Sequence, residues 1–200
     1  MRIKTSKTEV KHLARAWAAI TLAFTILFAR DMPSLSAVAI MFAVSGFTVG
    51  IGFLLHELAH KIVAQHYGLF AEFRSDGKML LIAIATAFFG IILAAPGAVY
   101  ISGYAGVNRN GKISMAGPLT NIILAALFLA ISFVLGQSML THYGQKINSW
   151  IALFNMIPFP PLDGSKVFAW DKRIWIVFVA FAAAAYISYL YFKNILYNDC

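Results

Sequence analysis

Long apolar stretches separated by short polar segments dominate the chain. An α-helix needs about 20 mostly apolar residues to cross a bilayer, and the stretches are close to that length. We therefore expect membrane-spanning helices rather than a water-soluble core. In chain order the stretches are Leu13–Ala29, Ala37–Tyr67, Met79–Gly106, Gly117 to about Leu140, a run from about Ile147 that meets Pro158, Pro160 and Pro161, and Ile174–Phe192.

The composition agrees with this pattern. Hydrophobic residues make up 60% of the 200 residues and charged residues 12%, whereas globular chains average about 45–50% and about 25%. This excludes an ordinary soluble domain and a disordered chain. The single cysteine excludes a disulfide framework and a cysteine-rich zinc site. The net charge of +8 comes from basic residues between apolar runs, which is typical of a membrane protein and not of a nucleic-acid binder.

The candidate chemistry begins with the motif His56-Glu57-Leu58-Ala59-His60, near the end of the second apolar stretch. Two histidines at i and i+4 lie on one helix face, so both imidazoles can reach one metal ion. Glu57 lies beside them and can accept a proton from a metal-bound water, whose pKa zinc lowers towards about 7. Ionisable residues in an apolar helix are costly and mark functional sites. The alternative is a polar helix end in interfacial water.

A catalytic zinc site needs a third protein ligand and one open position. Asp163 is the best candidate, because it ends an apolar run in which three prolines interrupt the helix. Irregular backbone at membrane depth is tolerated only inside protein or beside a wet cavity. Glu72 and Asp76 follow the motif helix in a polar turn, and Asp171 stands beside two basic residues as a surface charge would. The alternative for Asp163 is an interfacial helix terminus.

Together, His-Glu-Leu-Ala-His and Asn155-x-x-Pro-x-Pro-Pro-Leu-Asp163-Gly resemble the motifs of the site-2 protease family of intramembrane zinc metalloproteases. The segment Ala116-Gly-Pro-Leu-Thr-Asn121 resembles a further family element, and the resemblance covers about Ala37 to Gly164. No PDZ-like insertion or CBS-like tail is evident, so the chain looks like a minimal, prokaryotic-type member.

The resemblance implies one zinc ion per chain, with His56, His60 and Asp163 as ligands and Glu57 as general base. It implies that Asn155 holds the substrate or stabilises charge near the scissile carbonyl. Asn121 is a weaker substrate-binding candidate, because helix packing alone explains an asparagine there. Gly46, Gly50 and Gly52 thin the helix before the motif, and close helix packing is the simpler interpretation. The alternative is that Gly52, one turn before His56, leaves room for substrate.

The distribution of basic residues favours a re-entrant segment. If all six stretches cross the membrane and the N-terminus lies inside, ten of the 16 lysines and arginines lie on the inner side. If Met79–Gly106 instead enters and returns on one side, thirteen do, as the positive-inside rule prefers. Only this second arrangement also places Asp163 at the depth of His60. We expect five spans plus this segment.

The flanks of the re-entrant segment predict extended structure. Residues 70–73, 98–101 and 112–115 alternate or are β-prone. The resemblance to the site-2 protease family also implies a membrane-associated β-element near the site. An open strand edge there could bind an extended substrate by main-chain hydrogen bonds. Plain connecting loops are the alternative.

The sequence thus predicts an all-α polytopic membrane protein of about five to six spans, with a re-entrant or β-like segment between the two motif helices. We expect one membrane domain over 1–200, with a catalytic core at 37–164, an N-terminal span within 1–36 and a C-terminal span within 165–200. The first stretch could instead be a signal peptide, but no small-residue cleavage site follows closely.

The function expected is hydrolysis of peptide bonds within transmembrane segments of other proteins, in regulated intramembrane proteolysis. The protein would lie in a prokaryotic cell membrane, with a cytoplasmic N-terminus and the active site nearer the cytoplasm. Its partners would be a transmembrane substrate and the lipid bilayer, with no nucleic acid. The alternatives are an inactive relative and a membrane metal-binding or transport protein.

Overall fold

The computed structural model describes residues 3–30, 32, 34–92 and 96–198, with side chains described as far as Phe192. The chain divides into two compact units, Met1–Gly103 and Tyr104–Cys200. The expectation of a single membrane domain stays a prediction.

Within the described residues, four helices are long and apolar enough to cross a membrane. They are Lys7–Phe28, Leu35–His66, Gly106–Leu135 and Lys172–Phe192, and they correspond to four of the expected spans. Their apolar windows are only 11–44% buried within the protein. A water-soluble protein would not leave such long apolar faces uncovered, but lipid covers them at no cost.

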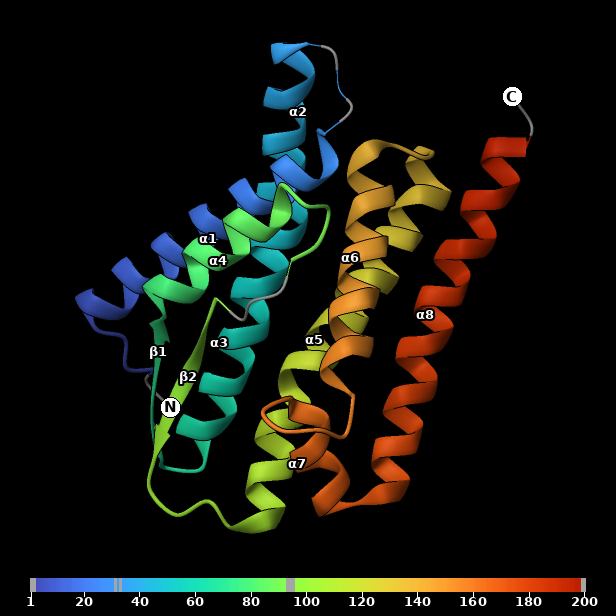
Figure 1. Cartoon of the computed structure of the whole chain (residues 1–200). Coiled ribbons are helices and arrows are strands. Elements are labelled where there is room, and N and C mark those ends of the chain that lie inside the picture. The colour runs from blue at the N-terminus through green and yellow to red at the C-terminus, as the bar shows by residue number, and fades with distance from the viewer. Residues whose placement is uncertain (1–2, 31, 33, 93–95, 199–200) are drawn as a thin grey trace. The chain divides into compact units, whose positions relative to one another are not determined.

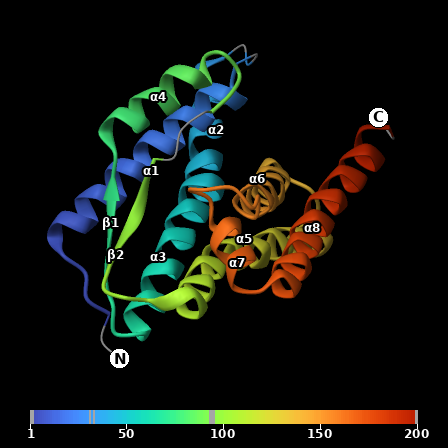
Figure 2. The ribbon, with the colours of Figure 1, turned by 60° about the horizontal axis from the view of Figure 1, so that its bottom comes forward.

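The first unit is built around helix α1, Lys7–Phe28, which begins after its N-cap Ser6. Helix α2 (Leu35–Ser45) continues through a π-helical turn, η1 (Gly46–Gly50), into α3 (Ile51–His66). Strand β1 (Phe70–Ser75) follows, then helix α4 (Gly77–Ala87) and strand β2 (Gly97–Ser102). Helices α1 and α4 lie side by side, with the strand pair at one end of α4 (Figures 1 and 2).

The two strands show that the segment between the motif helices turns back on itself. They pair antiparallel, with Phe70 opposite Ser102 and Ser75 opposite Gly97. Helix α4 has 11 residues, so it extends only about 16 Å, too short to cross a bilayer. Extended structure is confirmed at 70–73 and 98–101, and these two strands add a small sheet to the all-α class that we expected.

The second unit consists of helices that pack through small and polar residues. Helix α5 (Gly106–Leu135) and helix α6 (Met139–Asn155) form a hairpin, followed by α7 (Asp163–Trp170) and α8 (Lys172–Asn198) (Figure 1). A Cβ at Gly144 would lie 2.5 Å from the Phe128 ring, so the α5–α6 contact requires glycine there.

Two helices of this unit begin earlier than expected. Helix α5 starts at Gly106 rather than Gly117, so Pro118 lies inside it and 112–115 are helical, not extended. The reason is packing: Gly111 brings α5 against Trp170 of α7, where a Cβ would lie 2.4 Å from the Trp170 Cβ. Such a tertiary contact overrides local β-propensity.

Helix α6 starts at Met139 rather than near Ile147, because Ser138 and Thr141 form a capping box at its N-terminus. With 17 residues it is shorter than the four candidate spans. It ends at Asn155, and residues 156–162 form turns and bends before α7, so the predicted break at the prolines is confirmed.

The π-helical turn ahead of the histidine motif packs against α1. Trp17 Nε1 donates to the Gly46 carbonyl oxygen at 3.2 Å. A Cβ at Gly50 would lie 2.5 Å from the same Nε1. Close packing therefore explains Gly46 and Gly50, as the sequence suggested.

We expect Gly50→Ala to destabilise the protein by about 1–3 kcal/mol, because the added methyl group overpacks the contact with Trp17. The midpoint of thermal unfolding in detergent measures the effect. Gly77→Ala is the matched control, since a Cβ there meets nothing within 4 Å. Equal midpoints for the two variants would contradict the packing role of Gly50.

Candidate metal centre

Helix α3 places two imidazoles against each other. His56 and His60 are 4% and 7% exposed, and their Nε2 atoms lie 3.0 Å apart. The ring planes are nearly perpendicular, at 81°. Two nitrogens bound to one tetrahedral zinc at about 2.0–2.1 Å would be separated by about 3.3 Å. The pair is therefore arranged as two ligands of one ion.

Asp163 is positioned by the break between α6 and α7. It is the first residue of α7, and its side chain is 12% exposed. Gly164 allows the start of α7 to approach the end of α6, because a Cβ there would lie 2.3 Å from the Met156 carbonyl group. Trp175 Nε1 of α8 donates to the same Met156 oxygen at 2.8 Å. Two contacts thus hold the turn that presents the carboxylate.

The metal-ligating atoms of His56, His60 and Asp163 lie within 4.8 Å of one another. Two imidazoles and one carboxylate form a donor set that suits zinc, because a catalytic zinc ion takes three protein ligands and leaves its fourth position to water or substrate. Lys166 Nζ lies 3.8 Å from Asp163 Oδ1, one turn further along α7. These residues fit a catalytic zinc site.

The remaining predicted site residues lie as follows. Glu57 is 8% exposed and sits between the two histidines on α3, where Gly52 is also buried. Asn155 ends α6 and donates from Nδ2 to the Ile151 carbonyl oxygen at 3.0 Å. Asn121 is fully buried and donates to Asn148 Oδ1 at 2.8 Å, so it joins α5 to α6. Helix packing accounts for this contact.

Comparison with known proteins places the chain in a family. A protein of Methanocaldococcus jannaschii, MJ0611, is 39% identical over 173 residues, which cover 84% of this chain and 89% of the relative. The chain belongs to the site-2 protease family. YwhC of Bacillus subtilis is 31% identical over 60% of this chain and 65% of its own length. Rip3 of Mycobacterium tuberculosis is 29% identical over 57% of this chain and 27% of its own length.

All three relatives are named as putative zinc metalloproteases. No family model matches the chain, and no solved structure matches it. Membership in this family agrees with the donor set at His56, His60 and Asp163.

The sequence did not reveal what supports these ligands. The spacing rule for two histidines identifies the pair, but Gly164 and Asn148 gain their roles only from contacts between helices. One feature of the sequence could have indicated such support. Lys61 directly follows His60, and a lysine inside an apolar helix needs a partner from another part of the chain.

We expect purified wild-type protein to hold about one zinc ion per chain and Asp163→Ala to lose most of it, because zinc then lacks its third protein ligand. Elemental analysis in detergent measures this directly. Glu57→Gln should keep its zinc. Asp171→Ala is the matched control, since Asp171 lies at the other end of α7 and caps α8. Full zinc content in Asp163→Ala would show that the third ligand is another residue.

Proposed function

We propose that this protein is an intramembrane zinc metalloprotease that cleaves transmembrane segments of other proteins. The observation that supports this most directly is the close approach of the His56, His60 and Asp163 ligand atoms in a chain with four candidate spans. Two of the three relatives are at least 31% identical to the chain. We assign the roles of zinc ligands to His56, His60 and Asp163, with one ion per chain.

A zinc ion bound there would supply a Lewis acid that lowers the pKa of a water molecule and polarises a carbonyl group. The residues of the chain do the rest. The Glu57 carboxylate accepts a proton from the attacking water, and the water oxygen bonds to the carbonyl carbon. Glu57 then returns the proton to the amide nitrogen as the C–N bond breaks. Glu57 is buried and directly follows His56 on α3.

Asn155 can contribute a hydrogen bond to the carbonyl oxygen of the substrate. Its amide group has two N–H donors, and the Ile151 carbonyl uses one of them. The second donor is available to a substrate without breaking the helix-terminal bond. Gly52 and Asn121 would act only indirectly, through packing around the metal-binding helices.

The strand pair offers one edge for an extended substrate. On the outer edge of β1, Glu9 Oε1 accepts the Phe73 N–H, His12 Nδ1 accepts the Ser75 N–H, and Gln65 donates to the Ala71 oxygen. Side chains therefore occupy that edge. Because antiparallel pairing alternates, the N–H groups of Val99 and Ile101 then point away from β1. They have no hydrogen-bond partner among the described residues, so we propose that substrate adds to β2.

The membrane arrangement follows from the same elements. We propose five spans: the four candidate spans and, in addition, the 17-residue α6, which is about 25 Å long. The segment from β1 to β2 would be re-entrant. The N-terminus would be cytoplasmic, and the site would lie nearer the cytoplasmic face of a prokaryotic cell membrane. The relatives come from Methanocaldococcus, Bacillus and Mycobacterium, which agrees with a prokaryotic cell.

Zinc-loaded wild-type protein should cleave a transmembrane peptide that carries a helix-weakening residue, and should spare an all-leucine helix whose amides are hydrogen-bonded. Glu57→Gln should lower kcat by at least about a hundredfold, because it removes the general base. Mass spectrometry of the products measures both effects. His66→Ala is the control, since that exposed histidine lies one turn and a half beyond His60 on the same helix.

Absence of cleavage by zinc-loaded wild type across a set of such peptides would favour an inactive relative. Zinc movement into proteoliposomes that is unaffected by Glu57→Gln would favour a metal transporter, which has no use for a general base.

Val99→Pro tests the strand edge. Proline removes the outward N–H while leaving the bonds to β1 in place, so it is tolerated on an edge strand. We expect KM for the peptide to rise by about tenfold, the equivalent of one lost hydrogen bond of about 1.4 kcal/mol. Val99→Ala is the matched control, because it trims the side chain and keeps the N–H. Equal KM values for the two variants would exclude substrate binding at this edge.

A further inference from the structure

Lys61, the residue directly after the second histidine, is fully buried in the first unit. A buried ammonium group is costly unless it is paired and hydrogen-bonded. Its Nζ atom lies 2.5 Å from Glu9 Oε2 of α1, and both side chains are 0% exposed. Nζ also donates to Thr5 Oγ1 at 2.8 Å. The turn of α3 that carries His60 is therefore tied to the N-terminal end of α1.

Glu9 extends this tie to the sheet. Glu9 Oε2 accepts a hydrogen bond from Lys61 Nζ, and Glu9 Oε1 accepts one from the main-chain N–H of Phe73 at 3.0 Å. Phe73 is fully buried in β1, directly opposite Val99 of β2. A single carboxylate thus joins three elements: α1, the His60 turn of α3 and the strand pair.

A second contact repeats the tie one helical turn further along α3. Gln65 Nε2 donates to the Ala71 oxygen at 3.1 Å and to the Lys4 oxygen at 2.9 Å. From Lys61 to Gln65 the helix rises about 6 Å. From Phe73 back to Ala71 the strand covers about 6.7 Å. The contacts move forward along α3 and backward along β1, so the helix and the strand run antiparallel. The two spacings also match, so both contacts form at the same time.

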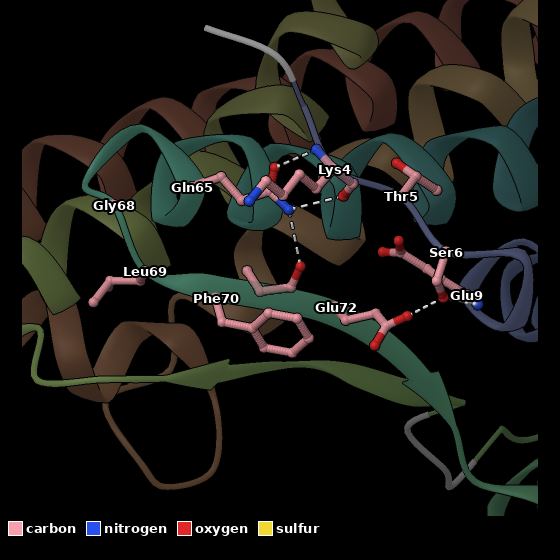
Figure 3. A pocket seen from close by; sticks show the side chains of 10 residues that line it. Lys4, Thr5, Ser6, Glu9, Gln65, Gly68, Leu69, Phe70 and Glu72 are labelled. Atoms are coloured by element: carbon pink, nitrogen blue, oxygen red, sulfur yellow. Dashed lines mark hydrogen bonds between the residues drawn. The ribbon is translucent and has the colours of Figure 1, made fainter.

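Glu9, Gln65 and Ala71 border a cavity of about 460 Å³ between the N-terminal segment, α3 and β1. Figure 3 shows Gln65 joined to Lys4, and Ser6 joined to Glu72, with Glu9 beside Ser6. Glu9 lines the cavity, and Lys61, its fully buried partner, does not. The hydrogen bonds at the cavity join the N-terminal segment, α3 and β1 to one another, so the cavity is a junction of elements.

We propose that Lys61 and Glu9 are positioning residues that fix the strand pair along α3, and so set which peptide bond of a substrate reaches the metal-binding histidines. The reason is that these contacts specify the register of the strand more than they add stability. A buried ion pair adds little stability compared with well-packed apolar side chains. The bond to the Phe73 N–H, by contrast, acts together with the Gln65–Ala71 bond and the buried Phe73 side chain to favour one register. A slip by two residues moves the strand by about 6.7 Å and takes Phe73 out of its buried position. This role rests on the proposed function and on substrate addition to β2.

Two double variants separate positioning from stability. Lys61→Met with Glu9→Gln removes both charges but keeps an oxygen that can accept the Phe73 N–H. Lys61→Met with Glu9→Met also removes both charges and has no acceptor. Both avoid an unpaired buried charge. Lys11→Met is the control for loss of a lysine, because Lys11 is exposed on α1.

The first readout is the cut site in a transmembrane peptide, mapped by mass spectrometry of the products. We expect the Glu9→Gln pair to cut at the wild-type bond. We expect the Glu9→Met pair to cut at several neighbouring bonds, with kcat/KM lower by at least about tenfold, because misplacement of a substrate by about 1 Å is costly. Both should retain zinc. A single unchanged cut site in the zinc-loaded Glu9→Met pair would overturn the proposal.

The second readout does not depend on proteolysis, so it separates this proposal from the proposed function. Hydrogen-exchange mass spectrometry of the β1 peptide should show faster exchange in the Glu9→Met pair and wild-type exchange in the Glu9→Gln pair. Equal exchange in both would overturn the positioning role even if no substrate is cleaved. If the Glu9→Met pair does not fold, Gln65→Leu serves instead, and an unchanged cut site in that folded variant would overturn the proposal.

Discussion

The cost of burying ionisable groups in an apolar environment governs the arrangement of this protein. Within about one and a half turns, α3 carries His56, Glu57, His60 and Lys61, and all four are buried. An isolated charge there would be far too costly, so each group has to meet a partner. Lys61 meets Glu9, and the two histidine Nε2 atoms approach each other within 3.0 Å. The partner of Lys61 comes from α1, whereas each histidine meets the other on the same helix.

This requirement explains why the sheet lies where it does. A strand pair is marginal by itself, because two strands have two open edges and little core. Here α1 and α3 satisfy one edge through Glu9, His12 and Gln65. The small core of Ala16, Phe73 and Leu80 packs beneath it. The remaining edge is the natural place for an extended chain, which a protease needs in order to expose an amide.

In the second unit some buried polar side chains are uncharged, and they too have partners on neighbouring helices. Asn121 pairs with Asn148, and Gln145 donates to Ser188. Small residues such as Gly111 and Gly144 bring the helix backbones close together. Among membrane helices, small residues and interhelical hydrogen bonds replace the hydrophobic effect as the source of association. The turn that presents Asp163 depends on this packing, through Gly164, Met156 and Trp175.

The sequence by itself determined the membrane class, four of the spans, the histidine pair and the acid that joins it. These features are local or compositional: apolar length, helical spacing, and an aspartate after a proline-broken helix. Only the tertiary structure decided that α5 begins at Gly106 and α6 at Met139, and that Glu9 belongs with Lys61 and Phe73. The physical reason is that the partner of a buried polar group lies far along the chain. Lys61 and Glu9 are 52 residues apart, and no local pattern encodes that distance.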